Sequence, residues 1–255
     1  MLELPGRESA CGTIPTTRPV PDPAPSPVRR LFSLSGVVPL GAFFVVHAAV
    51  NARAVRGDAA FVSAVGALHG IALLPVLEWL FIFAPLALHA GVGVWLVATR
   101  RPLADPSPYA PAVRVAVRAT GVLALAFLAM HLPELRFRGG ARLDGGQLET
   151  VLAADLSATF HAVPLRGLAY MLGAGCVAFH FAAGLWGFFA AARRGRESPA
   201  NLRRAAWGAG AVGMAMWMVL VGIVVCHATG ARVLGGTAEP WPTEPCPAPG
   251  ANGGK

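Results

Sequence analysis

Four histidines lie inside long apolar stretches of this 255-residue sequence. They occur in FFVVHAAV, IFAPLALHAGVGVW, LAFLAMHLPEL and GCVAFHFAAGLW, and they are His47, His89, His131 and His180. An imidazole that has lost its water destabilises an apolar helix unless it gains a hydrogen-bond partner or a metal. Because the four histidines fall in four different stretches, one shared chemistry is a better explanation than four accidents of packing.

The composition is typical of an integral membrane protein. Hydrophobic residues make up 55% of the chain and charged residues only 13%, whereas about a quarter of the residues of a soluble domain are charged. Apolar stretches long enough to cross a bilayer cover about residues 31–50, 73–98, 115–133, 166–192 and 205–228. We therefore predict an all-α fold, an integral membrane bundle of five transmembrane helices.

The two ends of the chain differ in composition from the rest. Residues 1–28 are rich in proline and lack the basic start and apolar stretch of a signal peptide. The tail, residues 231–255, is rich in proline and glycine. We predict that both are disordered extensions and that residues 29–230 form the membrane domain.

The net charge of +8 comes from arginines that cluster between the apolar stretches. Such clusters are typical of loops that stay on the cytoplasmic side of a membrane, so we expect no nucleic-acid partner. The arginines favour the N-terminal flank and the second and fourth loops. This bias predicts a multi-pass protein whose N-terminus lies in the cytoplasm.

With this orientation, the four histidines form two pairs by depth. At about 1.5 Å per residue, His89 and His180 lie roughly 15–18 Å from the cytoplasmic ends of their spans, and His47 and His131 roughly 24 Å. A six-coordinate haem iron takes two axial nitrogens from opposite faces of the porphyrin. Two depth-matched pairs therefore predict two b-type haems, one nearer each membrane surface, although a hydrogen bond to a neighbouring helix is the commoner role of a single membrane histidine.

Small residues near the histidines would let a flat ring lie against the backbone. They are Gly41, Gly91, Gly93, Gly121, Gly175 and Gly184. A zinc site is a weaker interpretation, because its ligands must converge on one point. The four cysteines form no CxxCH motif, which excludes a covalently attached c-type haem. The remaining histidines, His69, His161 and His227, are expected to be interfacial or solvated.

Several segments resemble the five-helix dihaem cytochrome b subunit of succinate dehydrogenases and fumarate reductases. They are VRRLFSLSGVVPLGAFFVVHAAVNARAVRGDAAF, LEWLFIFAPLALHAGVGVW, RATGVLALAFLAMHLPELRF and FHFAAGLWGF. The likeness runs over about residues 28–192 and includes the histidine spacing together with flanking glycine, proline and tryptophan. It does not extend to the fifth span or to either tail.

The resemblance implies that His89 and His180 hold an inner haem b and that His47 and His131 hold an outer one. It implies a chain in the inner membrane of a bacterium, with a flavoprotein that carries FAD and an iron–sulfur protein as partner subunits. Succinate would then react in a partner chain, and this chain would pass electrons to menaquinone or ubiquinone.

The resemblance also assigns candidate residues around the haems and the quinone. Arg29, Arg30 and Ser33 match the family's entry into the first helix, where basic groups can pair with haem propionates. His69 and Glu78 are the candidates for proton exchange with the quinone. The sequence departs from the family at Phe32, which stands where a histidine is usual, so any role of that histidine cannot be transferred.

Two other functions remain open at this stage. The chain could be the dihaem cytochrome b anchor of another quinone-linked dehydrogenase, such as a formate dehydrogenase or a hydrogenase. It could also be a haem-free membrane anchor, or a transporter that relays protons through its histidines.

Overall fold

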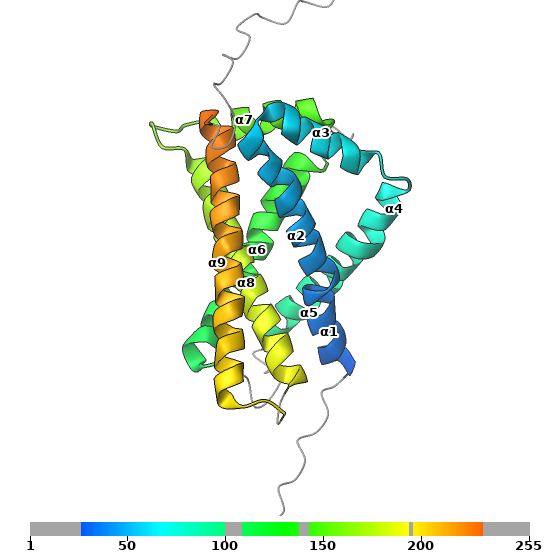
Figure 1. Ribbon diagram of the computed structural model, residues 1–255, viewed down its shortest axis with the longest axis vertical. Coiled ribbons are helices and arrows are strands. Elements are labelled where there is room, and N and C mark those ends of the chain that lie inside the picture. The colour runs from blue at the N-terminus through cyan, green and yellow to red at the C-terminus, as the bar shows by residue number, and fades with distance from the viewer. Residues whose placement is uncertain (1–26, 100–108, 138–142, 194–195, 232–255) are drawn as a thin grey trace, which may run out of the picture.

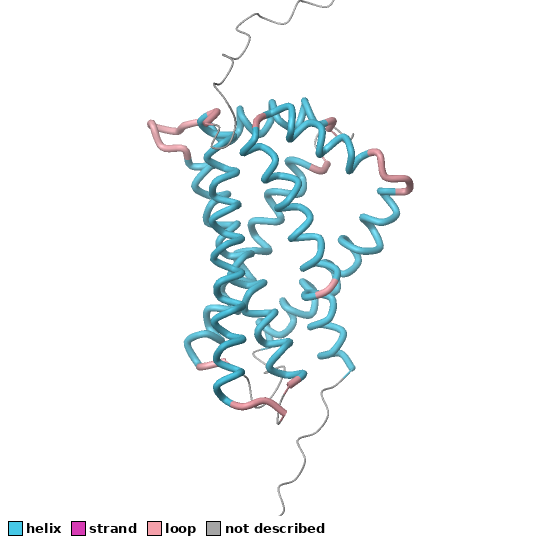
Figure 2. Tube along the Cα trace, in the orientation of Figure 1, coloured by secondary structure: helices cyan, strands magenta, loops and turns pink. Residues whose placement is uncertain are grey.

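The structure is a computed structural model that describes residues 27–99, 109–137, 143–193 and 196–231. Helices account for nearly all of this part of the chain (Figure 2), and its β structure is limited to an isolated bridge between Phe160 and Val163. In chain order the elements are α1 (Pro27–Val37), α2 (Pro39–Asn51), the 3-10 helix η1 (Ala52–Arg56), α3 (Asp58–His69), α4 (Leu74–Glu78), the π-helix η2 (Trp79–Phe83), α5 (Ala84–Thr99), α6 (Pro111–Leu135), α7 (Gly145–Ser157), α8 (Leu165–Ala192) and α9 (Pro199–Thr229).

Five helical segments of the described residues are long and apolar enough to cross a membrane. They are Arg30–Arg56, Leu74–Thr99, Pro111–Leu135, Leu165–Ala192 and Pro199–Thr229. The prediction of an all-α bundle with five spans is therefore confirmed. Each predicted span falls within, or within a residue of, one of these segments. The predicted extensions, residues 1–28 and 231–255, lie almost wholly outside the described residues.

Two of the spans are interrupted where the sequence has proline. α1 and α2 are separated at Val38, just before Pro39. In the second span, the π-helix η2 precedes Pro85, and the N–H of Ala84 donates to the carbonyl of Trp79 five residues earlier. Pro85 has no N–H to donate to the carbonyl of Phe81, and a shift to the wider π register accommodates that gap in the ladder.

Two further helices, α3 and α7, lie across one end of the bundle (Figure 1). Neither helix belongs to the five apolar stretches predicted from the sequence. α7 begins with a capping box in which Asp144 and Gln147 each accept from the other's backbone N–H. Its Leu152 and Leu156 are buried, and α7 packs against α3, α8 and α9. We call this the lid end of the molecule.

The opposite end is where α1, α6 and α9 begin (Figure 1). The arginines Arg30, Arg114, Arg118 and Arg203 are exposed there, and we call it the basic end. Between the two ends, α8 and α9 pack closely through small residues, among them Ala178, Ala182 and Gly213. The span that contains α5 is the loosest, with none of its most apolar 18-residue window buried.

Candidate functional site

The first site pairs His89 of α5 with His180 of α8. Their ring centroids are 6.1 Å apart and the ring planes are nearly perpendicular, at 83°. His89 Nδ1 donates to the carbonyl of Phe32 on α1 at 3.1 Å, and His180 Nδ1 donates to the carbonyl of Val117 on α6 at 3.1 Å. Because a carbonyl can only accept, Nδ1 carries the proton in both rings and the lone pair of each Nε2 is left for another partner.

Each ring of this pair also rests against a glycine. A Cβ added to Gly36 would lie 2.5 Å from His89 Cε1, and one added to Gly121 would lie 2.9 Å from His180 Cε1. In both cases the glycine is four residues after the residue whose carbonyl accepts the hydrogen bond. We call this arrangement of a carbonyl and a glycine, which occurs on both α1 and α6, a glycine seat. Phe32, at the position where a histidine was expected, stacks on His89 with centroids 4.4 Å apart and planes within 3°.

The glycines predicted to lie beside the histidines are only partly correct. Gly121 contacts a histidine, but it is His180 of α8 and not His131 of its own helix. A Cβ on Gly41 would instead meet Phe181, one on Gly175 would meet Trp217, and Gly91 and Gly184 face open space. Gly36 was missed, because nothing in its local sequence shows that α1 meets α5 at this residue.

The second site pairs His47 of α2 with His131 of α6. Their ring centroids are 5.9 Å apart and the planes are again perpendicular, at 89°. Aromatic rings surround this pair. Phe127 stacks on His131 at 5.3 Å, and Tyr170 meets the same ring edge-on at 5.7 Å. Nδ1 of His131 is buried and has no hydrogen-bond partner among the described residues.

The spacing of both pairs fits a haem iron held between two imidazoles. An imidazole nitrogen lies about 1 Å from its ring centre and binds a metal at about 2 Å, so two imidazoles on opposite sides of one iron have centres roughly 6 Å apart. Within the described parts of the chain, no group of three or more His, Cys, Asp or Glu side chains converges as a metal cluster would require. Two imidazole nitrogens are the set that haem needs, because the porphyrin supplies the other four.

Ion pairs lie at the lid end, near the second site. Glu78 pairs at 2.7 Å with Arg136, which directly follows α6 and was not predicted as a site residue. His69, the other quinone candidate, is the last residue of α3 and is separated from α4 by a short turn. Both candidates therefore lie at the same end of the bundle as His47 and His131.

A second polar network connects the ring of His131 to the surface of the lid end. Tyr170, whose ring touches His131, donates its hydroxyl to Glu134 at 3.3 Å. Arg166 pairs with Glu134 at 2.7 Å and with Asp155 at 2.9 Å. The carboxylates of α6 and α7 thus neutralise the arginine at the start of α8.

The predicted propionate candidates lie on α1, the helix that supplies the carbonyl of Phe32. Arg30 is exposed and Ser33 is partly buried, and the side chain of Arg29 is outside what the structure describes. A residue that the prediction missed is Ser35. It is buried, and its hydroxyl donates to the Phe32 carbonyl at 2.9 Å. That oxygen therefore accepts two side-chain hydrogen bonds.

Of the remaining histidines, His161 is exposed in a turn, in line with the prediction. The expectation of an interfacial or solvated ring is wrong for His227, which is 5% exposed. Its Nδ1 lies 3.1 Å from Glu149 Oε2, so this contact joins α9 to α7 at the lid end. The capping box of α7 was the available signal that a helix there could carry such a partner.

Comparison with known proteins gives one match of high significance. The chain is 34% identical over 163 residues to the succinate dehydrogenase cytochrome b558 subunit of Bacillus subtilis (strain 168), which covers 63% of this chain and 76% of that protein. No protein-family profile and no solved structure matches the chain.

Proposed function

Because this chain belongs to the family of succinate dehydrogenase cytochrome b subunits, we propose that it is the dihaem membrane anchor of a succinate:quinone oxidoreductase. His89 and His180 bind the inner haem b, and His47 and His131 bind the outer one. The chain passes electrons between an iron–sulfur partner subunit and quinone in the membrane. Succinate is oxidised, or fumarate reduced, in a partner flavoprotein that carries FAD.

The observation that carries this proposal is the repeated geometry of the two histidine pairs. Each pair joins two different helices, and each has ring centres about 6 Å apart with nearly perpendicular planes. Val117, which bonds His180, and His131 are both on α6 and are separated by about 21 Å at 1.5 Å per residue. Two sites at this separation lie at different depths, as a path across a bilayer of about 30 Å requires.

A bound haem supplies a one-electron couple at its iron, and the residues of the protein fix the position of that iron. The carbonyls of Phe32 and Val117 fix the Nδ1 tautomer of the inner histidines and aim Nε2 at the metal. The glycine seats keep the two rings in place. At the outer site Phe127 and Tyr170 pack around the ring of His131 and exclude water. The absence of water strengthens electrostatic interactions at this site.

The iron–sulfur partner docks at the basic end in this proposal. The inner pair is nearer that end, because His89 bonds to α1 close to its start and His180 bonds to α6 close to its start. The basic end has more exposed arginines than the lid end, which favours the cytoplasmic side for it. At the lid end Arg53 and Arg56 are exposed, but Arg136 and Arg166 are paired with carboxylates. This supports a cytoplasmic N-terminus, and the similarity to a subunit from a bacterium supports a bacterial inner membrane.

Quinone reacts at the lid end in this proposal, where Glu78 and His69 are available to hold and move protons. The carboxylate of Glu78 is held by Arg136 at 2.7 Å, which fixes its position at this end of the bundle. The quinone in this proposal is menaquinone or ubiquinone.

The test is a redox spectrum of the purified complex. We expect two haems b per chain by pyridine haemochrome assay, both reduced by dithionite and at least the inner one by succinate. A spectrum without an α band would identify a haem-free anchor or a proton-relay transporter. Reduction by formate or hydrogen but not by succinate would assign the chain to another dehydrogenase.

A further inference from the structure

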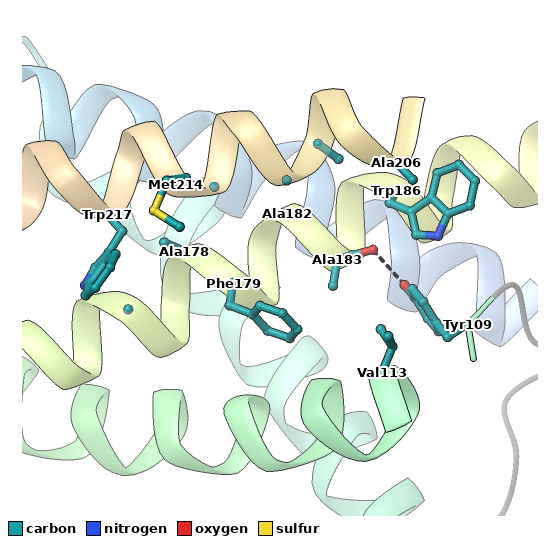
Figure 3. Close-up of a pocket in the computed structure, with 14 residues that line it drawn as sticks. Tyr109, Val113, Ala178, Phe179, Ala182, Ala183, Trp186, Ala206, Met214 and Trp217 are labelled. Atoms are coloured by element: carbon teal, nitrogen blue, oxygen red, sulfur yellow. Dashed lines mark hydrogen bonds between the residues drawn. The ribbon is translucent and has the colours of Figure 1, made fainter. Parts of the chain in front are cut away.

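An apolar groove runs along the outside of the bundle between α8 and α9, with the start of α6 as its third wall (Figure 3). Its volume is about 400 Å³. Tyr109 and Trp186 stand at one end, and Met214 and Trp217 stand at the other. His180 is not in its lining and faces α6 instead, so the groove is separate from the haem sites and an inference about it does not rest on the proposed function.

The polar tips of Tyr109 and Trp217 are bonded to the protein backbone. The hydroxyl of Tyr109 donates to the carbonyl of Ala183 at 2.7 Å, and the indole N–H of Trp217 donates to the carbonyl of Met171 at 3.2 Å. Both bonds are to α8, so the rings present only their hydrocarbon to the groove. Most of the remaining lining is glycine, alanine and other apolar residues, so the groove suits a hydrocarbon chain.

The length of the groove matches one leaflet of a bilayer. On α9 the lining runs from Ala206 to Trp217, about 16 Å at 1.5 Å per residue. The hydrocarbon core of a bilayer is about 30 Å thick, so the groove covers about half of it. The transmembrane helix of another subunit, or of a second copy, would contact a face that crosses the whole membrane.

The groove begins at the basic end. Arg203 precedes Ala206 by three residues and Gly210 by seven, which places it on the groove face of α9 one turn before the lining begins. Arg203 is exposed, and no hydrogen bond or ion pair joins it to another described residue. Arg114 follows the lining residue Val113 and is also exposed. Two cations therefore flank the mouth of a hydrocarbon groove at the level of the lipid headgroups.

We propose that this groove binds one acyl chain of an anionic phospholipid, whose phosphate pairs with Arg203. The acyl chain lies on the glycine and alanine residues between α8 and α9, and it ends near Trp217 at the middle of the membrane. A quinone tail would fit the apolar part of the groove, but a quinone carries no anion for the arginine.

The chain offers matched variants for the test. Gly210 lines the groove, and a Cβ on it would meet nothing within 4 Å. Gly208 has equally open surroundings but is not in the lining. Gly210→Leu therefore fills the groove, and Gly208→Leu is its control. Arg203→Gln removes the cation on the groove face, and its control is Arg204→Gln, because Arg204 lies about 100° away on the helix and bonds Asn201.

The measurement is native mass spectrometry of the whole complex, purified and then exposed to mixed micelles that contain phosphatidylglycerol or phosphatidylcholine. We expect one tightly held phosphatidylglycerol per chain in the unmodified protein and in Gly208→Leu, and at least a tenfold weaker retention in Gly210→Leu. Arg203→Gln should reduce the preference for phosphatidylglycerol about fivefold, and Arg204→Gln should leave it unchanged.

Several outcomes would overturn the proposal. Equal retention of lipid in the two leucine variants would show that the groove is not the site. Loss of bound quinone instead of phospholipid in Gly210→Leu would identify a quinone tail, and a halved mass would identify a second copy of the chain. If Gly210→Leu fails to insert, Ala206→Leu fills the same groove and decides the question. The haem spectrum of each variant reports on the proposed function separately.

Discussion

The two histidine pairs have nearly the same ring geometry, but the protein holds them in different ways. Backbone atoms position His89 and His180, through the carbonyls of Phe32 and Val117 and the glycines that follow them. At the outer pair, ring contacts to Phe127 and Tyr170 surround His131, whose Nδ1 has no hydrogen-bond partner within the described structure. The inner rings thus have a fixed tautomer, whereas packing alone orients the outer ring.

This difference should make the inner site rigid and the outer site adaptable. A carbonyl within a helix cannot move without breaking its own ladder, so a ring bonded to it keeps its orientation. Aromatic walls restrict a ring less, because they contribute no directional bond. The predictions below test this comparison, beginning with the largest expected effect.

The largest effect is expected from removing a ligand. His89→Ala and His180→Ala should each remove the same haem and lower electron transfer from succinate to quinone by about 100-fold or more. His47→Ala and His131→Ala should each remove the other haem, while succinate still reduces the inner one. Reduced-minus-oxidised spectra at low temperature separate the two components.

Methionine variants at the same four positions serve as controls, because methionine fills space and ligates iron weakly. They distinguish a lost ligand from a bundle that collapses around a cavity. If the variants of His47 and His89 lost the same spectral component, the pairing would be wrong.

The glycine seats come next. Gly36→Ala and Gly121→Ala should push the inner imidazoles off their carbonyls and weaken inner-haem binding about 10- to 100-fold, while the outer haem is retained. Haem titration of the apo-complex measures this. Gly91→Ala, beside His89 on α5 but facing open space, should bind both haems normally. Normal inner-haem binding in both seat variants would contradict the rigid-site interpretation.

At the lid end, Glu78→Gln and His69→Ala should each slow quinone turnover about tenfold or more, the usual scale of lost proton transfer. Both haems should remain, because neither residue lies in a histidine pair. Steady-state reduction of a quinone analogue, with the haem spectrum as control, measures the effect. Unchanged turnover in both variants would move the quinone site away from the outer pair.

A smaller effect is expected at Ser35. Its hydroxyl and His89 share the Phe32 carbonyl as acceptor, so Ser35→Ala should strengthen the bond from His89 and make its imidazole a better donor to iron. A change of about 1 kcal/mol corresponds to roughly 40 mV for a one-electron couple. The inner potential should fall by this order in a redox titration and the outer one should not. A rise of the inner potential would contradict the shared-acceptor argument.

The smallest effect is expected from deleting residues 2–26, which precede α1. Their composition cannot bury a core, so both haem bands should keep their intensity and position. Loss of either band in a stably inserted protein would show that the extension contributes to a site.

Much of the architecture could be predicted because it depends on short-range properties of the chain. The five spans follow from apolar length, and the depths of the histidines follow from a constant rise per residue. The seats at Gly36 and Gly121 could not be predicted as a pair, because they depend on how neighbouring helices are rotated against each other. α7 was missed for a different reason, since its capping box around Asp144 is a local signal that a search for long apolar stretches overlooks.

The partners of the charged residues could not be predicted from the sequence either. The sequence singled out Glu78 but not Arg136, which lies 58 positions away and pairs with it. His227 was expected at a wet surface because it ends a span, yet α7 covers it and supplies Glu149. A residue's partner across the bundle is a property of the packed helices, and composition carries no information about it.

The loose packing of α5 has a consequence for the assembly of the protein. α8 and α9 bury one another, whereas the span that contains α5 buries none of its most apolar window. A ligand shared by His89 and His180 therefore contributes its binding free energy directly to the docking of α5, as metals do in small domains that fold on binding them. After membrane insertion, the helices α6, α8 and α9 should pack together first. α5 should pack against them when the cofactor binds. In a cell short of haem, α5 would be the first helix exposed to membrane proteases.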